Sequence, residues 1–244
     1  MTRHGRAVMA AEPVVAAGIG LRFGLSWVVR SASFRVGAPA PDSAPLGLLL
    51  DYPAQATAVI DLLAGVARPA YGELRVLGHD MSTVRGRAAV RRRVGVARRG
   101  TRALPGIRIR RLVEHAAWLN RQGRRDRHAL AAAILDRLEL LPWADVPLGS
   151  APEPVVRRVR LAAAAVHQPE LLLLDGLLDG LSARDASGLA DAVRDLSRDS
   201  SIVLAGCDSD GVHRACDEIL VLADGILMSA DIVVEPVPLG TPPD

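Results

Sequence analysis

The chain has 244 residues, a net charge of +3 and an apolar fraction of 50%. This composition supplies enough apolar material for a core and excludes a chain that is disordered throughout. All 30 basic residues are Arg, because the sequence contains no Lys. Chemistry that requires an ε-ammonium group, including Schiff bases and the lysine that clamps phosphates, is therefore excluded.

The cysteines and the apolar segments limit the setting of the protein. Cys207 and Cys216 are too few for a disulfide framework or a complete zinc site, which favours a reduced cytosolic setting. Glu12 and Pro13 interrupt the apolar stretch at 7–20, which predicts the entry to a strand and not a signal peptide. No apolar run approaches the roughly 18 to 20 residues that span a bilayer. Any role at a membrane is expected to be peripheral or mediated by a partner.

The first half of the chain carries strand signals followed by helical ones. Strands are expected at 13–17, 27–36, 47–50, 72–78 and 94–97, with one helix at 56–64. Apolar residues at helical spacing then predict helices at 111–120, 128–140 and 155–167, the last with Pro154 in its first turn. These helices indicate a helical lobe inserted at about residues 108–168.

The second half alternates strands and helices. Strands are expected at 171–175, 201–205 and 219–222, and helices at 183–196 and 212–215. A turn is expected at Asp224 and Gly225. Alternation of this kind predicts a parallel sheet wrapped by helices. Residues 1–12 and the proline-rich residues 235–244 are expected to be flexible.

One segment is strongly basic. Residues 81–113 contain no Asp or Glu, and the whole chain has only 3% aromatic residues, too few for the stacking platforms that bind single-stranded nucleic acid. The segment is expected to face phosphates, anionic lipid or an acidic protein, or else only solvent. Its arginines are Arg85, Arg87, Arg91, Arg92, Arg93, Arg98, Arg99, Arg102, Arg108, Arg110 and Arg111.

The order of several segments resembles the nucleotide-binding subunits of ATP-binding-cassette (ABC) transporters. VRLAAAAVHQPELLLLD at 159–175, continued by GLLDGLS, resembles the stretch from the signature helix to Walker B. Other matches are LLAG at 62–65, GELRVLGHD at 72–80, RRRVGV at 91–96, LPGIRIRRLVEHAA at 104–117 and CDEILVLADG at 216–225.

The resemblance covers about residues 13–230, and it implies an α/β, P-loop NTPase-like fold. A RecA-like core with a parallel sheet would carry an N-terminal antiparallel β subdomain and an inserted α-helical subdomain. Residues 13–234 would form a single domain. A doubly wound sheet of an unrelated protein could also contain a buried strand that ends in Asp.

The phosphate loop of the family, G-x-x-G-x-G-K-[ST], falls on LDYPAQAT at 50–57, where only Thr57 matches. In the family this Thr would hold Mg²⁺, but as a single threonine in a helix it is expected to cap the first turn. Glycines let backbone N–H groups converge on phosphate, and the lysine neutralises its charge. Asp51 adds a negative charge instead. The positions that lose a donor, a positive φ or the lysine are Leu50, Pro53, Gln55 and Ala56.

The family positions for hydrolysis are also altered. Asp175 keeps the metal-side carboxylate of Walker B, but Gly176 replaces the catalytic glutamate. Arg99 stands at the glutamine that senses Mg²⁺, Cys207 at the switch histidine and Ser182 at the D-loop aspartate. Loss of the general base alone costs about 10² to 10⁴ in rate.

Four further positions carry expectations. Asp179 is not expected to replace the missing base. The signature LSGGQ falls on APEPV at 151–155, where prolines remove N–H donors and Glu153 is expected to fill the anion site at the helix end with its own carboxylate. Phe23 could stack on adenine or belong to the core. His167 is expected on the surface of a helix.

The resemblance therefore implies a degenerate cassette subunit, or pseudo-ATPase, with no catalytic residue, metal or cofactor. Its expected partners are a transmembrane permease or an intact cassette subunit, in a dimer or hetero-oligomer at the cytoplasmic face of the membrane. One alternative is an ATPase that energises transport and binds ATP and Mg²⁺ through Thr57, Asp175 and Phe23. Another is a regulator outside transport that binds acidic protein or nucleic acid through its Arg-rich segment.

Overall fold

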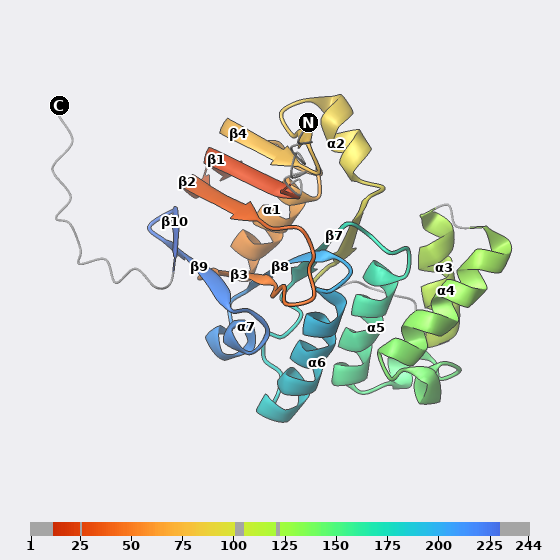
Figure 1. Ribbon diagram of the computed structural model, residues 1–244. Coiled ribbons are helices and arrows are strands. Elements are labelled where there is room, and N and C mark those ends of the chain that lie inside the picture. Colours follow the sequence, from red (N-terminus) through yellow and green to blue (C-terminus); the bar gives the residue numbers. More distant parts are fainter. Residues whose placement is uncertain (1–11, 25, 101–104, 121–122, 230–244) are drawn as a thin grey trace, which may run out of the picture.

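The computed structural model describes residues 12–24, 26–100, 105–120 and 123–229 (Figure 1). Nearly all of the residues expected to be flexible, 1–11 and 235–244, lie outside this part of the chain. The described strands are β1 Val14–Phe23, β2 Ser26–Val36, β3 Leu46–Leu49, β4 Tyr71–Val76, β5 His79–Asp80, β6 Val94–Ala97, β7 Leu171–Asp175, β8 Ser201–Gly206, β9 Glu218–Ala223 and β10 Ile226–Ser229. The described α-helices are α1 Pro53–Leu63, α2 Val84–Val90, α3 Ile109–Leu119, α4 Arg124–Arg137, α5 Glu153–Ala165, α6 Ala183–Leu196 and α7 Ser209–Ala215.

All of these strands belong to one sheet, in the order β5-β4-β1-β2-β10-β9-β3-β8-β7-β6. β3 and β6 to β9 form its parallel half, in which β3 pairs with β8 and β9, and β7 pairs with β6 and β8. β1, β2, β4 and β5 form the antiparallel half. β10 joins the halves, because it runs parallel to β2 and antiparallel to β9. The expected core and β subdomain are confirmed.

The parallel strands are buried on both faces. In β7, Leu171 and Leu173 point into the core that contains α1, and Leu172 and Leu174 point into the core that contains α5, α6 and α7. A strand covered on both sides by helices gains from an apolar side chain at every position, which explains the continuous run LLLL. As Figure 1 shows, α1 lies between the parallel strands and the antiparallel half.

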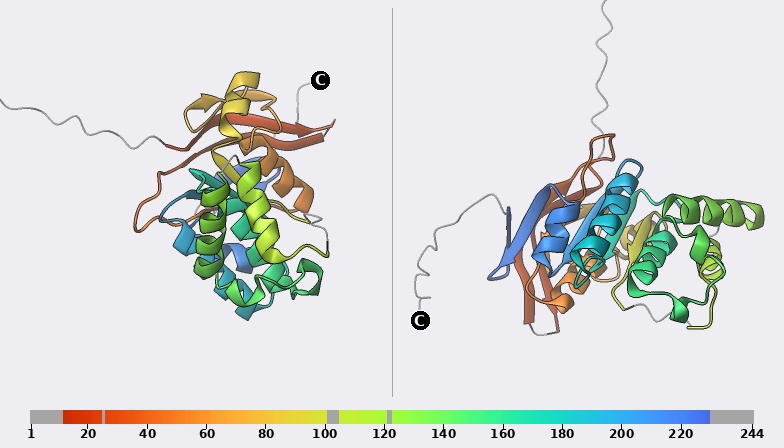
Figure 2. Two further views of the ribbon diagram at one scale, coloured as in Figure 1. Left: turned by 90° about the vertical axis from the view of Figure 1, so that its right-hand side faces the viewer. Right: turned by 90° about the horizontal axis from the view of Figure 1, so that it is seen from below.

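The helical lobe is formed by α3, α4 and α5 with two 3₁₀ turns, Leu141–Trp143 and Leu148–Ser150. Ile109, Val113 and Ala117 follow each other at a spacing of four residues on the buried face of α3. α3 packs on α4 and α5, and α5 also packs on β6, β7 and α6. Figure 2 shows α3 and α4, in green, projecting to one side of the sheet. No helix in the described part of the chain is both long and apolar enough to cross a bilayer.

Besides the 3₁₀ turns, the structure adds three elements, β5, α2 and β10, and moves the start of the first helix. α2 begins where Thr83 Oγ1 accepts the N–H of Gly86 at 3.0 Å, inside the segment that the sequence marks only as basic. β10 follows the expected turn, in which both Asp224 and Gly225 have positive φ. The first helix begins at Pro53, three residues before the predicted start at Ala56.

The prediction that His167 lies on a helix surface is wrong. His167 follows α5, and both of its ring nitrogens are buried without a hydrogen-bond partner. Burial lowers the pKa of His167, and the nearby backbone of Val94 offsets only part of this effect. The imidazole is therefore neutral in the folded chain around neutral pH.

We expect the free energy of unfolding to decrease as the pH falls below 6.5, the ordinary pKa of histidine. In this range the unfolded chain protonates His167 while the folded chain does not, so acid favours the unfolded chain. The variant His167→Gln should show a smaller decrease, measured by urea unfolding at a series of pH values. His213→Gln, which changes an exposed histidine, is the control. Equal pH dependence in His167→Gln and the unaltered chain would contradict this assignment.

Candidate functional site

The candidate site lies at the carboxyl ends of the parallel strands. Asp175 is the last residue of β7 and is 2% exposed. Arg99 follows β6 by two residues, Cys207 follows β8 directly, and Leu50 follows β3. Parallel strands end at one edge of a sheet, so these residues of distant sequence positions meet there.

The segment at 50–57 is the beginning of α1 and has no phosphate-binding loop. The N–H groups of Gln55 and Ala56 donate to the carbonyl of Tyr52 at 3.0 and 3.3 Å, and the N–H of Tyr52 donates to Oε1 of Gln55 at 3.1 Å. No residue from 50 to 57 has a positive φ, so the alternating conformations of an anion nest do not occur here. The N–H groups of Tyr52, Gln55 and Ala56 therefore already have acceptors within the chain.

The depression beside this segment is lined without any positively charged residue. Ala56, at the lysine position, is fully buried, and Leu50 is 2% exposed. A shallow depression beside the start of α1 is lined by Leu49, Leu50, Asp51, Tyr52, Cys207, Ser209 and Val221, without an arginine. A triphosphate placed there would meet the exposed carboxylate of Asp51, and the guanidinium of Arg99, which lies beside Asp175, is already paired with Asp175 and Asp179. The residues do not fit a bound nucleotide phosphate.

Thr57 reaches Asp175. Its Oγ1 donates to Oδ2 of Asp175 at 2.7 Å. The prediction that Thr57 caps the first turn of the helix is wrong, because α1 begins four residues earlier and the hydroxyl bonds across to β7. Two of the three retained family positions are thus adjacent. The side chain of the third, Phe23, lies outside the part of the structure that is described.

Arg99 occupies the space beside Asp175. Its Nε lies 3.4 Å from Oδ1 of Asp175, and its Nη2 donates to Oδ2 of Asp179 at 2.5 Å. Asp179 also accepts the backbone N–H groups of Cys207 and Asp208 at 3.1 and 3.2 Å. A guanidinium therefore balances both carboxylates, and the charge that a metal ion would supply is already present in the chain.

The surroundings raise the pKa of both Arg99 and Cys207. Burial alone would lower the pKa of Arg99, but the hydrogen bond to Asp179 and the charges of Asp179 and Asp175 outweigh it, so the pKa is raised. Burial, followed by the charge of Asp179, raises the pKa of Cys207. Its sulfur is therefore a thiol at neutral pH, which favours a small structural residue over a reactive thiolate.

Gly176 and Arg99 depend on each other. Gly176 has φ of +58°, and a Cβ built on it would overlap the guanidinium of Arg99. The Cβ atoms of real side chains do not tolerate such an overlap, so Arg99 would have to leave its carboxylates. Gly176 stands at the family's glutamate position and Arg99 at its glutamine position, so the residue present at one of these positions limits what the other can hold.

The sequence did not reveal the role of Asp179. It was not expected to act as a base, and the structure shows its carboxylate engaged by Arg99 and two backbone N–H groups. One signal was available in the sequence. Arg99 has no acidic residue near it in sequence, so a carboxylate that pairs with it has to come from a distant segment. Ser182, in place of the D-loop aspartate, caps α6: its Oγ accepts the N–H of Asp185 at 3.2 Å.

In the signature segment, the carboxylate of Glu153 forms an ion pair with Arg157. α5 begins at Glu153, after Pro152, which offers no side-chain cap. Oε1 of Glu153 accepts from Nε of Arg157 at 2.9 Å. The carboxylate stands in the first turn, as expected, but the hydrogen bond goes to Arg157, so the expectation that it fills the anion site of the helix end is corrected.

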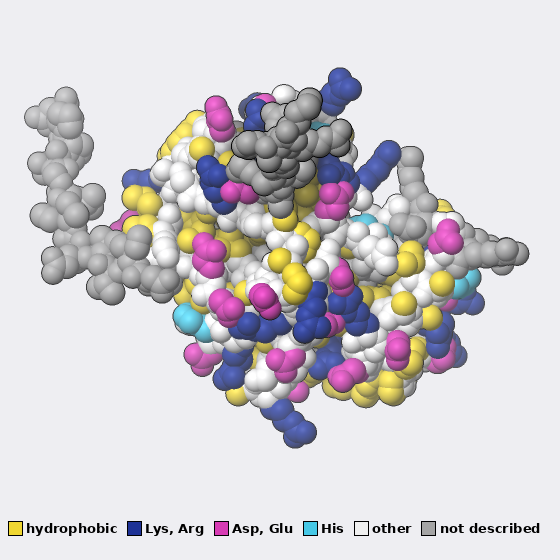
Figure 3. Space-filling view, in the orientation of Figure 1, with side chains coloured by type: hydrophobic (Ala, Val, Ile, Leu, Met, Phe, Trp, Pro, Cys, Tyr) yellow, Lys and Arg dark blue, Asp and Glu magenta, His cyan; other side chains and the backbone are white. Residues whose placement is uncertain are grey.

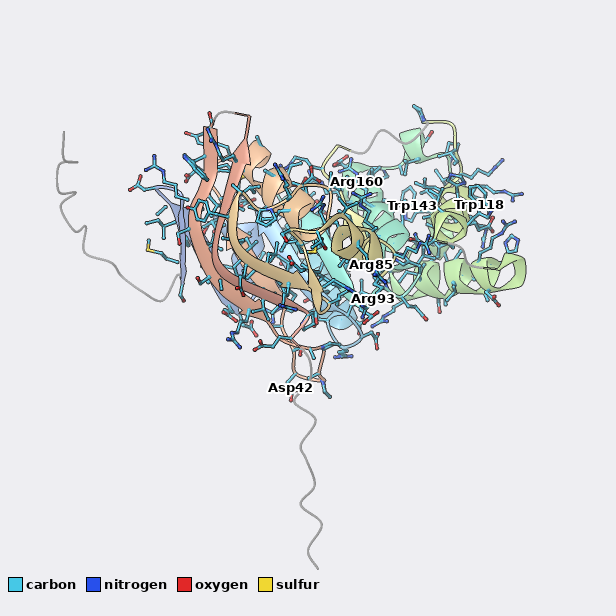
Figure 4. All side chains as sticks on the ribbon, turned by 90° about the horizontal axis from the view of Figure 1, so that it is seen from above. Asp42, Arg85, Arg93, Trp118, Trp143 and Arg160 are labelled. Atoms are coloured by element: carbon cyan, nitrogen blue, oxygen red, sulfur yellow. The ribbon has the colours of Figure 1, made fainter. Side chains whose placement is uncertain are left out.

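Most of the described arginines of the basic segment have a hydrogen-bond or ion-pair partner within the fold. Arg93 donates two bonds to Glu170 at 2.6 and 2.7 Å, whereas Arg85 is exposed on α2 (Figure 4). On the face drawn in Figure 3, acidic and Arg side chains are intermixed. Arg102 lies outside the described residues. Arg92, like Arg85, is exposed. Arg99 aside, the partners of the remaining arginines are the carbonyls of Met81 and Ser82 for Arg87, of Gly65 for Arg91 and of Asp145 for Arg108, and the carboxylates of Asp61, Asp145 and Glu114 for Arg98, Arg110 and Arg111.

Comparison with known proteins gives consistent results. The sequence model of the ABC transporter family matches residues 56–178, half of the chain, and so begins after most of the altered phosphate-loop positions. Nod factor export ATP-binding protein I of Burkholderia orbicola is 28% identical over 219 residues, which are 89% of this chain and 70% of the relative. Methionine import ATP-binding protein MetN of Caulobacter vibrioides is 28% identical over 181 residues, 72% of this chain and 54% of the relative.

Solved structures show the same fold. The cbiO1 subunit of the cbiONQ ABC transporter complex from Clostridium perfringens superposes with a TM-score of 0.77 at 15% identity, covering 89% of this chain and 87% of that one. A nucleotide-free ATP-binding cassette from an ABC transporter gives a TM-score of 0.74 at 14% identity, with 89% and 90% covered.

We expect Gly176→Ala to destabilise the chain more than Gly180→Ala. Both glycines have positive φ, which costs an alanine about 1–2 kcal/mol, but a Cβ on Gly180 meets open space. The excess at Gly176, about 1.5–3 kcal/mol for displaced charge-assisted hydrogen bonds, should be measurable by chemical denaturation. It should disappear in an Arg99→Ala background. An excess that persists there would show that Arg99 is not the group displaced.

Proposed function

This chain belongs to the ABC transporter family, and we propose that it is a pseudo-ATPase, a cassette subunit that keeps the fold without the nucleotide chemistry. The observation that carries the proposal is the Arg99 guanidinium between Asp175 and Asp179, at 3.4 and 2.5 Å. A fixed cation in this place competes with a metal ion for the same carboxylate oxygens. The proposal gives the site no catalytic residue and no resident cofactor.

The start of α1 supports the same proposal. A charge-assisted hydrogen bond contributes about 1.5–3 kcal/mol, so loss of three such bonds to phosphate weakens binding by roughly 10³ to 10⁶-fold. Here Pro53 has no N–H, and those of Gln55 and Ala56 are bonded to Tyr52. A micromolar affinity would become millimolar or weaker.

The proposed role is that of a structural or regulatory partner in a transporter. By family, the chain would pair with an intact cassette subunit, a transmembrane permease or both, and would lie peripherally at the cytoplasmic face of the membrane. Its own described helices include none that could span a bilayer. Isolation of the native complex under mild detergent should therefore recover a membrane-spanning protein or a second cassette with it. Recovery of nucleic acid alone would instead support the regulator outside transport.

A second candidate is a cassette that still binds ATP. The observation in its favour is the bond of Thr57 to Asp175 at 2.7 Å, which keeps two family positions together. It conflicts with the position of Arg99, which lies against the same carboxylate. The regulator that binds nucleic acid is not favoured, because carboxylates and backbone carbonyls of the fold already accept hydrogen bonds from most of the described arginines of the basic segment.

Isothermal titration with Mg-ATP is expected to show no binding tighter than about 1 mM, because the phosphate donors and the cation are missing. ATP hydrolysis by the purified chain should not exceed the buffer background. The methionine import ATP-binding protein of Caulobacter vibrioides, measured in parallel, is the positive control. Binding of Mg-ATP at micromolar affinity would contradict the proposal and favour the second candidate.

A further inference from the structure

Both connections between the helical lobe and the sheet lead to one short loop. The chain enters the lobe after β6, where Arg99 lies, and leaves it through α5, which carries Arg157. The loop at 176–179 follows β7 and receives bonds from both arginines. Entry and exit of the lobe are therefore attached to the same few residues of the core.

The entry is held through Asp179. This carboxylate is 13% exposed, and the ion pair with Arg99 at 2.5 Å is its link to the lobe connection. Its other bonds come from the N–H groups of Cys207 and Asp208, which follow β8. Arg99 is thus attached to the carboxyl ends of both β7 and β8, and it cannot move without exposing a partly buried charge.

The exit is held through Arg157, whose side chain is 15% exposed. Its Nη1 lies within hydrogen-bond distance of the carbonyl oxygens of Gly176, Leu177 and Asp179, at 3.1, 3.0 and 2.7 Å. Its Nε donates to Glu153 at 2.9 Å, in the first turn of α5. One guanidinium therefore ties the start of α5 to the loop after β7.

A third attachment lies at the far end of α4. Arg137 donates from Nε to Asp195 Oδ2 and from Nη1 to Asp199 Oδ2, both at 2.6 Å. Its Nη2 donates to the carbonyl of Asp195 at 2.9 Å. Asp195 lies in α6 and Asp199 just after it, so this bridge joins the lobe to the core. Hydrogen bonds and the charges of both carboxylates raise the pKa of Arg137, although its burial acts in the opposite direction.

We propose that Arg157 and Arg137 form an internal clasp that fixes the helical lobe in one orientation against the core without any ligand, and that Arg99 holds in place the loop to which Arg157 is bonded. The planar guanidinium donates several bonds in fixed directions, which suits it to join three or more acceptors at once. A hinge requires connections that can change conformation. Here the exit through α5 is bonded to the core, and the entry is bonded as far as Arg99, before residues 101–104, which lie outside the described part of the chain. The clasp goes beyond the proposed loss of nucleotide chemistry, because it concerns the orientation of the lobe and holds whether or not nucleotide binds.

The clasp has a consequence for ligands and partners. A ligand shifts a conformational equilibrium only as far as it binds one state better than the other. Since the carboxylates of the site are already paired with Arg99, Mg-ATP would have to displace Arg99 from them before it could turn the lobe. A partner would therefore meet the same lobe surface at all times, including the exposed Trp118 and Leu119 of α3.

The orientation of the lobe can be measured on the full chain by pulsed electron–electron double resonance, which gives the distribution of distances between two nitroxide labels. Nitroxide labels are placed at Leu119→Cys in α3 and Glu73→Cys in β4, both exposed positions, in a Cys207→Ser background. Cys216 can stay, because burial raises the pKa of its thiol to about 12. We expect one narrow distance distribution that excess Mg-ATP leaves unchanged. A broad distribution, or one that Mg-ATP shifts, would overturn the clasp.

Removal of the clasp should free the lobe. The double variant Arg99→Gln with Arg157→Gln is expected to broaden the distance distribution. The control is Arg93→Gln, which breaks an exposed ion pair with Glu170 at 2.6 Å between the starts of β6 and β7 and should leave the distribution unchanged. Unchanged width in the double variant would contradict the proposal. If circular dichroism shows that the double variant does not fold, Arg157→Gln alone, which removes the bonds to the three carbonyls of the loop, replaces it, with broadening again expected.

The two proposals fail separately. A narrow, unshifted distribution together with micromolar binding of Mg-ATP would leave the clasp standing and overturn the pseudo-ATPase. A broad distance distribution without nucleotide binding would overturn the clasp and leave the pseudo-ATPase proposal standing.

Discussion

The pairing of Arg99 with the buried carboxylate of Asp175 and with Asp179 is the interaction on which the site depends. Asp175 ends a strand that is covered on both faces, and a carboxylate in such a place requires hydrogen bonds and a positive charge. Thr57 supplies a hydrogen bond and Arg99 the charge. Residue 176 must then be glycine, and the loop after β7 takes the form that brings Asp179 to the guanidinium. One ion pair thus accounts for two departures from the pattern of the family, at positions 99 and 176.

Much of the fold could be predicted from the sequence, because its signals are local. The apolar run of β7 and the amphipathic pattern of α6 give the observed bounds, since a strand buried on both faces and a helix buried on one leave distinct patterns. The start of α1 at Pro53 could not be read from the alignment of motif letters. Once its glycines are replaced, the segment takes the helical conformation that its residues prefer, and the helix grows toward the strand.

The partners of the arginines could not be predicted in the same way. A stretch without Asp or Glu indicates a basic surface when only neighbours in sequence are considered. In the fold, Asp61, Asp145 and Glu170 approach it from other elements, and Arg87 and Arg91 bond to backbone carbonyls. His167 illustrates the same limit, because its position after α5 gives no sign that β6 and its neighbours bury the ring. Charge and burial at single positions are decided by tertiary contacts.

The mutual exclusion between a side chain at residue 176 and the guanidinium at residue 99 also bears on the history of the chain. Restoring an acidic residue at 176 alone would collide with the arginine, and restoring a neutral amide at 99 alone would leave two carboxylates without a counter-ion. Each step back costs stability before the other can recover it. Such sign epistasis acts as a ratchet, because it favours keeping the glycine and the arginine together over changing either one alone.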